Sequence, residues 1–373
     1  MRISISSDDI KNKIENFISL IDGNYYHKYK LYDLYKNYNY KFIEKISGEH
    51  SIIIVDKFRN RLYAYTDIFG TKPLYFGFKD KKFKVTSFRY DLNGYNGIKR
   101  IPNSSILKLD TYDHSFTIEK HSKFDTTEKY NTFERCIDAL KNAIDIRCED
   151  NIGSAFSAGH DTGAILQRIN ENNTKCNFYY FNTNKEDSDI IKARQQKCNL
   201  TELNYIVNSN VHIKCQLAKI KDKPIDVDYN KDLDLTSLLI SIFEKAKDDN
   251  IKNFITGLGG DEVLKNNTTY PDIDKDLKTH ISERDDFLIG EYPGNNSEQG
   301  QEGRFWIDIE ESISNIYGIN LRYPFLDKHF IQEFLNLTYK AKNYCYKSVT
   351  QIYLKRTNMP FMLRKSGFSS IKS

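Results

Sequence analysis

The sequence predicts two domains of different class: an α+β domain with antiparallel strands, then an α/β domain with a parallel sheet. A chain of 373 residues is longer than one ordinary hydrophobic core supports. Residues 48–110 are mostly short β segments joined by turns, whereas strand and helix patterns alternate from residue 132 onward, which favours a parallel sheet with right-handed crossovers. We place the boundary in the polar segment 120–130, giving domains 1–125 and 126–373.

The first domain shows strand patterns over most of its length. Strands are expected at the apolar runs 51–56, 61–67, 82–88 and 101–110, with 57–60 as the turn of a hairpin. The preceding segment 25–40 is rich in tyrosine and lysine, a composition that can stack on single-stranded bases. Leu31, Leu34 and Tyr35 follow helical spacing there, with Tyr38 beyond, so we prefer an amphipathic helix.

In the second domain the apolar period changes to that of helices. Apolar side chains at 133, 137, 140 and 144 predict a helix. The expected elements after it are a strand at 152–156, a helix from Thr162, a strand at 177–182, a helix from Asp187, a helix over 235–246 and a strand at 253–256. This alternation predicts that the carboxyl ends of the strands share one edge of a sheet.

Composition narrows the class of protein. The net charge is only +4 with 28% charged residues, which argues against nucleic acid as the partner. The six cysteines show no C-x-x-C pair, which argues against a zinc site or a disulfide framework. The first residues are charged and no run of eighteen apolar residues occurs, so we expect a soluble cytoplasmic protein without membrane contact.

The stretch AFSAGHDTGAIL, residues 155–166, carries polar side chains where a strand turns into a helix. Backbone N–H groups and the positive end of the helix dipole collect in such a turn, and Ala158 and Gly159 are small enough to let an anion approach. Asp161 would repel a bare phosphate, so it suggests an intervening Mg²⁺ ion with a polyphosphate. An ordinary turn with a capping aspartate fits this stretch as well.

A second turn of matching design follows the strand expected at 253–256. FITGLGGDEVL, residues 254–264, runs from an apolar strand into three glycines and the acids Asp261 and Glu262. Two such turns at neighbouring strand ends would face one crevice. Asp161 and Asp261 are therefore predicted to share one Mg²⁺.

The motifs of this sequence resemble those of a known family, the asparagine synthetases and β-lactam synthetases. SAGHDTG resembles the pyrophosphate loop of N-type ATP pyrophosphatases, and GLGGDE resembles the corresponding synthetase turn. LRYPFLD (321–327) and KSGF (365–368) match later synthetase blocks, whereas SGEHSIIIVD and TDIFGTKPLYFG match the preceding glutaminase domain. The resemblance implies an Ntn-hydrolase-like first domain, here truncated, and an ATP pyrophosphatase second domain.

The resemblance also implies roles for individual residues. ATP and pyrophosphate would bind at Ser157, Ala158, Gly159, His160, Asp161, Thr162 and Gly257, with Mg²⁺ held by Asp161 and Asp261. Lys365 would supply a fixed positive charge to the phosphates, although a basic tail is the plainer explanation of that residue. Arg322 and Asp327 would shape the wall of the substrate pocket, beside Leu258.

Several residues depart from the family pattern. Its glutamine-hydrolysing members use an N-terminal cysteine, but residue 2 is Arg2 and no cysteine precedes Cys136. We therefore expect a shortened first domain that does not hydrolyse glutamine. Leu258 stands where the family places an acid or a tyrosine, and leucine cannot accept a proton. Either another group does so, with Glu262 or His160 as candidates, or the enzyme handles a different acceptor.

The favoured hypothesis is an ATP-dependent amide-bond-forming ligase that adenylates a carboxylate and releases AMP and pyrophosphate. Its partners would be a small carboxylate and ammonia or an amine, with a separate ammonia-supplying protein and a homodimer as open options. Two alternatives are a non-catalytic nucleotide-binding relic or subunit, which Leu258 favours, and a tRNA-modifying ATP pyrophosphatase. The glutaminase-like blocks count against the latter.

Overall fold

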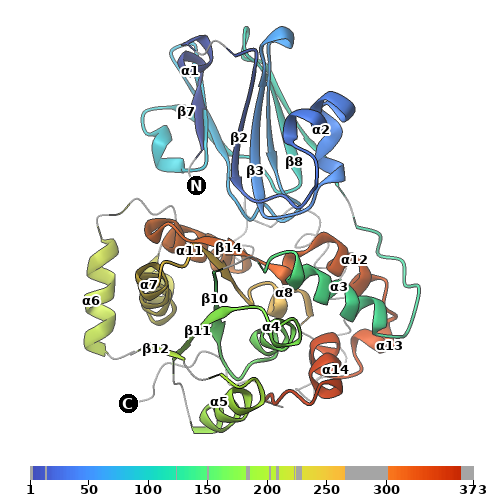
Figure 1. Cartoon of the computed structure of the whole chain (residues 1–373). Coiled ribbons are helices and arrows are strands. Elements are labelled where there is room, and N and C mark those ends of the chain that lie inside the picture. Colours follow the sequence, from blue (N-terminus) through green and yellow to red (C-terminus); the bar gives the residue numbers. More distant parts are fainter. Residues whose placement is uncertain are drawn as a thin grey trace. The chain divides into compact units, whose positions relative to one another are not determined.

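The computed structural model describes residues 3–264 and 301–362, apart from short gaps. These gaps are residues 13–14, 123, 149–150, 182–184, 201–202, 207–209, 222 and 224–228. The chain divides into two compact units, 1–124 together with 283–311, and 125–282 together with 312–373 (Figure 1). Lys365, the lysine expected at the phosphates, lies outside the described residues.

The first unit contains two antiparallel sheets. A four-stranded sheet has the order β1 (Ser4–Ser6), β6 (Lys82–Thr86), β5 (Tyr75–Lys79) and β7 (Asn96–Arg100). A five-stranded sheet has the order β2 (Phe17–Gly23), β3 (His50–Asp56), β4 (Arg61–Thr66), β8 (Ser105–Asp110) and β9 (Phe116–Lys120). The helical segments are α1 (Ser7–Asn12), α2 (Leu31–Tyr38), η1 (Asn39–Lys45), η2 (Lys57–Arg59) and η3 (Arg89–Leu92).

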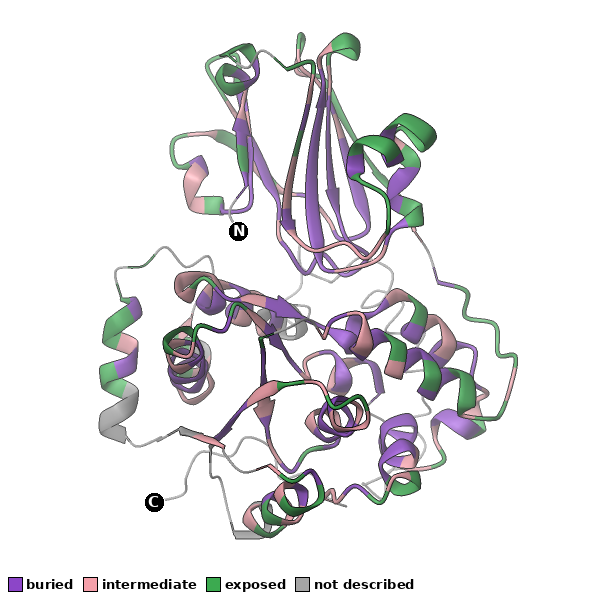
Figure 2. Cartoon of the chain, viewed as in Figure 1, coloured by how far each residue is buried: buried purple, intermediate pink, exposed green. Residues whose placement is uncertain are grey.

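Strand β3 shows how this sequence builds a layered unit, because every one of its residues is buried (Figure 2). Alternate side chains of a strand point to opposite faces. Ile53 and Val55 join the core that also contains residues of the four-stranded sheet, whereas Ile52 and Ile54 join the core beneath α2 and η1. The uninterrupted apolar run of β3 thus reflects a central strand covered on both faces.

Two ion pairs hold the start of helix α11 (Gln301–Tyr317) within the first unit. Lys72 Nζ lies 2.5 Å from Glu311 Oε1, with side chains that are only 3% and 4% exposed. Arg100 makes two bonds to the carboxylate of Asp308, of 2.8 and 3.1 Å. These contacts join a segment more than 200 positions away to the N-terminal sheets, which local sequence patterns do not reveal.

Replacing Lys72 by methionine is expected to destabilise the first unit by about 3–5 kcal/mol, because it leaves the Glu311 carboxylate buried without its cation. The free energy of unfolding in urea measures this cost. The double variant Lys72→Met/Glu311→Leu should recover most of it, since removing both charges also removes the penalty of burying them. A single variant as stable as the wild type would show that this pair does not hold α11 in place.

The second unit is built on a five-stranded parallel sheet with α7 on one face and α3, α4 and α14 on the other (Figure 1). Its strand order is β12 (Asn204–Ile206), β11 (Cys176–Phe181), β10 (Ile152–Phe156), β13 (Asn253–Ile255) and β14 (Asn320–Arg322). The helical segments are α3 (Glu134–Asp145), α4 (His160–Glu171), α5 (Lys185–Lys197), α6 (Asn210–Ile220), η4 (Tyr229–Asp232), α7 (Leu233–Asp248), α8 (Gly260–Leu264), η6 (Pro324–Leu326), α12 (Lys328–Leu335), α13 (Tyr339–Lys342) and α14 (Ser348–Arg356).

The direction in which strands are added reverses at β10. The chain continues from β10 to β11 and β12 on one side, then returns to place β13 and β14 on the other side. Parallel sheets of this kind bind ligands at the carboxyl ends of the two strands that flank such a switch point. Here these are the ends of β10 and β13, from which the two glycine-containing turns emerge.

The two expected classes are confirmed at the level of sheets, antiparallel first and parallel second. Several element bounds differ from those expected, and one of them bears on the site. Helix α4 begins at His160 rather than Thr162, because the extended Gly159 already serves as its N-cap, so Asp161 belongs to the first helical turn. Among the described helices, none combines the length and apolar character needed to cross a bilayer.

Candidate functional site

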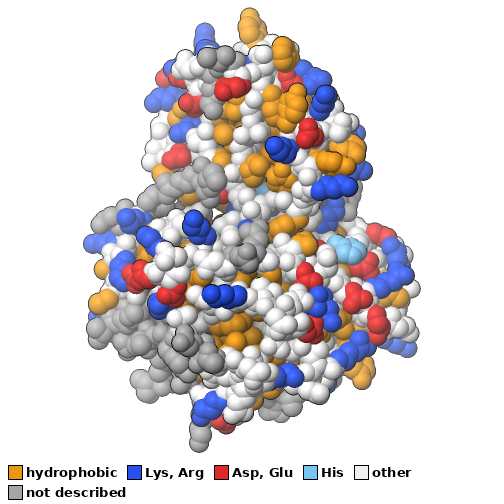
Figure 3. All heavy atoms as spheres, in the orientation of Figure 1, with side chains coloured by type: hydrophobic (Ala, Val, Ile, Leu, Met, Phe, Trp, Pro, Cys, Tyr) orange, Lys and Arg blue, Asp and Glu red, His pale blue; other side chains and the backbone are white. Residues whose placement is uncertain are grey.

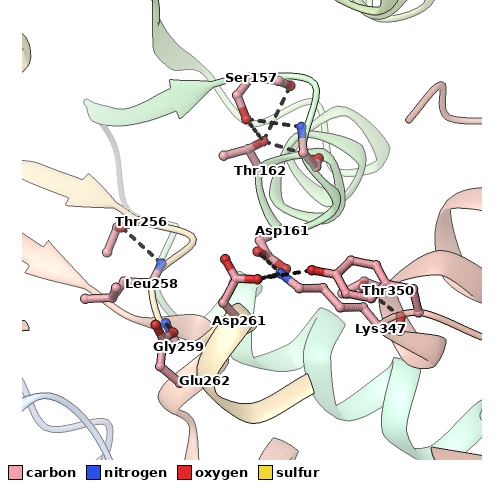
Figure 4. A network of polar contacts seen from close by, with 12 residues as sticks. Ser157, Asp161, Thr162, Thr256, Leu258, Gly259, Asp261, Glu262, Lys347 and Thr350 are labelled. Atoms are coloured by element: carbon pink, nitrogen blue, oxygen red, sulfur yellow. Dashed lines mark hydrogen bonds and ion pairs between the residues drawn. The ribbon is translucent and has the colours of Figure 1, made fainter. Parts of the chain in front are cut away.

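Hydrogen bonds of the Ser157 and Thr162 hydroxyl groups stabilise the turn after β10. Ser157 Oγ and Thr162 Oγ1 lie 2.7 Å apart, and the Gly159 amide donates to Ser157 Oγ at 3.2 Å (Figure 4). Ala158 and His160, between them, are buried. The hydroxyls that we expected at the phosphates therefore also fix the shape of the loop.

The two aspartates predicted to share a metal meet at one cation. Lys347 Nζ forms an ion pair with Asp161 Oδ2 and lies 2.9 Å from Asp261 Oδ1 (Figure 4). The lysine side chain is only 3% exposed. Burial by itself would lower the pKa of Lys347, but attraction to the two carboxylates outweighs it and raises that pKa above its ordinary value. The site is therefore a cation between two acids.

The approach of the two turns depends on glycine at position 260. A Cβ atom there would lie 2.4 Å from Cγ of Asp161, a distance that no side chain tolerates. Gly260 opens α8 and is followed directly by Asp261. Without a side chain at this position the two acids can approach the same ammonium group.

The donor set suits Mg²⁺ that arrives bound to phosphates. Asp161 and Asp261 offer carboxylate oxygens, which hard divalent cations prefer. In the described part of the chain, no cluster of three or more His, Cys, Asp and Glu side chains could hold a metal unaided. Magnesium is commonly held by one or two carboxylates together with substrate phosphates, so these residues fit the ion without a dedicated cage.

Next to Asp261, the carboxylate of Glu262 is engaged with the backbone. Glu262 Oε2 accepts a bond of 2.9 Å from the Gly259 amide, the contact of a residue that caps the start of α8. Burial raises the pKa of Glu262 above its usual range. Leu258 lies in the same turn, where its amide donates to Thr256 Oγ1 at 3.2 Å. The role of Glu262 as a base stays a prediction.

Aromatic rings enclose the other base that we considered. The ring of His160 lies 5.5 Å from that of Tyr346 and 5.0 Å from that of Phe361, measured between centroids. The hydroxyl of Tyr346 in turn donates to Asp261 Oδ1 at 3.4 Å. His160 thus belongs to the packing around the site, and its part in proton transfer stays a prediction.

Arg322 and Asp327, which we expected in the pocket wall, support the framework. The buried Arg322 donates to Asn253 Oδ1 at 3.0 Å, and its carbonyl accepts from Thr256, which joins β14 to the start of the second turn. Asp327 caps α12 through the amides of His329 and Phe330 and pairs with the buried Arg147 at 3.0 Å. Contact of either residue with substrate stays a prediction.

Lys347 is the residue that sequence reasoning missed. It is one of 55 lysine and arginine residues and lies in none of the blocks quoted above. Its backbone has φ of +47°, a left-handed conformation that costs a non-glycine residue about 1–2 kcal/mol and is often found at functional sites. In the sequence alone nothing marks this strain.

Two comparisons with known proteins find similarity to this chain. Residues 10–92 match the family model described as a glutamine amidotransferase domain. The chain is 24% identical over 369 residues to "Putative asparagine synthetase [glutamine-hydrolyzing] 1" of Methanocaldococcus jannaschii, a match that covers 86% of this chain. The chain spans 64% of the length of that relative.

Two solved structures resemble the chain weakly. One is the allosteric regulatory enzyme of purine biosynthesis, with a TM-score of 0.22; the match covers 46% of this chain and 49% of that one. The other is the glutamine phosphoribosylpyrophosphate amidotransferase of B. subtilis, with a TM-score of 0.20; the match covers 46% of this chain and 50% of that one. Both are 10% identical in sequence. The description of the fold therefore rests on the strand orders given above. Residues 10–92 are thus similar to a glutamine amidotransferase domain, and most of the chain is similar to a putative asparagine synthetase.

Proposed function

We propose that the chain is an ATP-dependent ligase that joins a carboxylate to ammonia or an amine, with release of AMP and pyrophosphate and without glutamine hydrolysis. The observation that carries the proposal is the convergence of Asp161 and Asp261 on the ammonium of Lys347, at the carboxyl ends of two adjacent parallel strands. The relative in M. jannaschii, described as a putative asparagine synthetase, supports the same reaction class.

In this proposal the β- and γ-phosphates of ATP lie on the turn 157–162. Asp161 and Asp261 would hold Mg²⁺, which neutralises charge on the phosphates. Lys347 takes the role that we first assigned to Lys365, a fixed positive charge beside the departing pyrophosphate. Asp261 is partly exposed and Lys347 is buried, so the ammonium group of Lys347 lies at the edge of the site.

The reaction has two steps. An oxygen of the substrate carboxylate attacks the α-phosphorus of ATP, and the bond from this phosphorus to the β-phosphate bridging oxygen breaks, so that pyrophosphate leaves with the electron pair. The amine nitrogen then attacks the acyl carbon, loses a proton and displaces AMP. In the proposal a side chain near Leu258 accepts that proton, and we assign this role to Glu262, an acid of the same turn with a pKa raised by burial.

Among the residues given, Cys136 is the first cysteine, and this supports ammonia or an amine as the nitrogen donor in the proposal. Cys136 itself is buried in α3, and burial raises the pKa of its thiol well above the usual range, which makes it a poor nucleophile. A separate protein that supplies ammonia is compatible with this arrangement. The carboxylate is a small molecule whose identity we leave open.

A second candidate is a nucleotide-binding subunit that does not catalyse ligation. Leu258 favours it, because this side chain can neither accept a proton nor bind a substrate amine. Such a subunit would bind ATP at the same turn. A role on RNA has no comparable support, since basic and acidic side chains are interspersed on the face shown in Figure 3.

Exchange of labelled pyrophosphate into ATP tests the proposal directly. The purified chain, supplied with Mg²⁺, ATP and a panel of small carboxylates, should catalyse exchange with at least one of them. Addition of ammonium should then yield AMP and an amide, whereas glutamine should not release glutamate. Binding of ATP without exchange for any carboxylate would favour the non-catalytic subunit, and release of glutamate would overturn the proposed nitrogen source.

A further inference from the structure

A buried arginine lies directly behind the turn that we assign to the phosphates. Arg194 of α5 is completely buried, and its guanidinium donates to three backbone carbonyls: Nη1 to Ser157, Nη2 to Gly159 at 3.0 Å and Nε to Pro360 at 2.7 Å. Among the residues that the structure describes, it pairs with no carboxylate. A buried cation without a counter-ion is costly, so its presence calls for an explanation.

The charge of Arg194 persists at neutral pH. Burial lowers the pKa of this guanidinium to about 9, which still leaves it protonated. Three neutral carbonyls satisfy its donors but do not cancel its charge. An anion on the other side of the turn would do so.

The contacts of Arg194 help to fix where the backbone amides of the turn point, together with the Gly163 amide, which donates to the Gly159 carbonyl at 3.1 Å. In a trans peptide the N–H and C=O groups point in opposite directions. Because the carbonyls of Ser157 and Gly159 face Arg194, the amides of Ala158 and His160 face away from it. Within the described residues, the amide of Ala158 meets no acceptor. It is therefore available to a ligand.

Helix α4 leaves space for this guanidinium at Gly163. A Cβ atom on Gly163 would lie 2.3 Å from Nη2 of Arg194. Glycine inside a helix costs about 1 kcal/mol relative to alanine, so the helix gives up stability at the point where Arg194 passes. Gly163 thus leaves room for the guanidinium, and the guanidinium contacts the turn.

We propose that Arg194 is a positioning residue for a polyphosphate ligand: it turns the amides of Ala158 and His160 toward pyrophosphate and places positive charge behind them. This inference rests on the proposed function. Two hydrogen bonds also hold residues 360–362 against the turn. Arg194 donates to the Pro360 carbonyl, and the Met362 amide donates to the Ala158 carbonyl at 3.4 Å.

Calorimetric titration of the full chain with inorganic pyrophosphate and Mg²⁺ tests the inference. Arg194→Lys keeps a positive charge but not the planar set of donors that reaches three carbonyls, so we expect binding about 10–100-fold weaker. The matched control is Arg168→Lys on α4, where the arginine pairs with Asp145 and Glu171 away from the turn, and pyrophosphate should bind it as it binds the wild type.

A double-mutant cycle with Gly163 separates positioning from general stability. Gly163→Ala should weaken pyrophosphate binding in the wild-type background because the new methyl group displaces the guanidinium. In an Arg194→Ala background it should have no further effect on binding, and it should raise the melting temperature through better helix propensity. If Gly163→Ala weakened pyrophosphate binding as much in the Arg194→Ala background as in the wild type, the inference would be overturned.

The result for the wild type distinguishes the two proposals. If the wild-type chain binds pyrophosphate and Arg194→Lys binds it equally well, the role of Arg194 is wrong while the proposed function stands. If the wild-type chain binds neither pyrophosphate nor ATP, both are wrong. Weaker binding by Arg194→Lys with an unchanged Arg168→Lys control supports both.

Discussion

Replacement of Lys347 by methionine is expected to reduce pyrophosphate exchange by about 10³-fold or more. The ammonium group of Lys347 is the fixed positive charge that contacts both acids, and removal of such a charge from a phosphoryl-transfer site typically has an effect of this size. Methionine keeps the length and apolar character of the lysine stem. The loss would therefore report the charge rather than a cavity.

The same variant should make stability depend on magnesium. In the wild type the two carboxylates and the ammonium carry a net charge of −1, and in Lys347→Met the two carboxylates face each other with −2. Breaking a buried ion pair of this kind costs about 3–5 kcal/mol. We expect Mg²⁺ to raise the melting temperature of Lys347→Met more than that of the wild type, because the ion restores the missing positive charge.

Lys342→Met is the matched control for this experiment. Lys342 is also buried and lies five positions earlier, but it forms an ion pair with Glu128, at 3.8 Å, rather than with Asp161 and Asp261. This variant should keep its exchange activity, and Mg²⁺ should raise its melting temperature no more than it raises that of the wild type. A Lys347→Met protein that exchanges pyrophosphate at the wild-type rate would remove the lysine from the proposed chemistry.

The parts of this site that the sequence predicts are those marked by local pattern. A strand followed by a glycine-containing turn and an acid occurs twice, and parallel strands bring such turns to one sheet edge, so the meeting of Asp161 with Asp261 could be expected. The strands of the first unit could be expected too, because the apolar run at β3 reports burial directly.

The parts that could not be predicted depend on how distant segments return to the site. Lys347, which precedes α14, and Arg194, which lies in α5, come from elsewhere in the chain, and no spacing relates them to Ser157 or Asp161. Amphipathic periodicity indicates which face of a helix is buried but not what it meets. In the same way, Lys72 gives no indication in the sequence that its partner is Glu311.

Replacement of either aspartate of the proposed metal site by asparagine is expected to lower exchange by about 100-fold or more and to raise the Mg²⁺ concentration that half-maximal exchange requires. Asparagine keeps the size of the side chain but offers only a neutral oxygen to the cation. The matched control is Asp249→Asn, since Asp249 is exposed to a similar extent (20% against 16% for Asp161) and also pairs with a lysine, Lys245. Its exchange activity should be unchanged.

Stability should respond much less to Asp261→Asn than to Lys347→Met. Asp261→Asn leaves Lys347 with one carboxylate, a neutral pair, so its free energy of unfolding should change little. Combining Asp261→Asn with Lys347→Met removes the repulsion between the two acids and should recover much of the stability that Lys347→Met loses, without recovering exchange. If the double variant were no more stable than Lys347→Met alone, charge repulsion would not explain that loss. A double variant that did exchange pyrophosphate would show that the reaction needs neither the second acid nor the lysine.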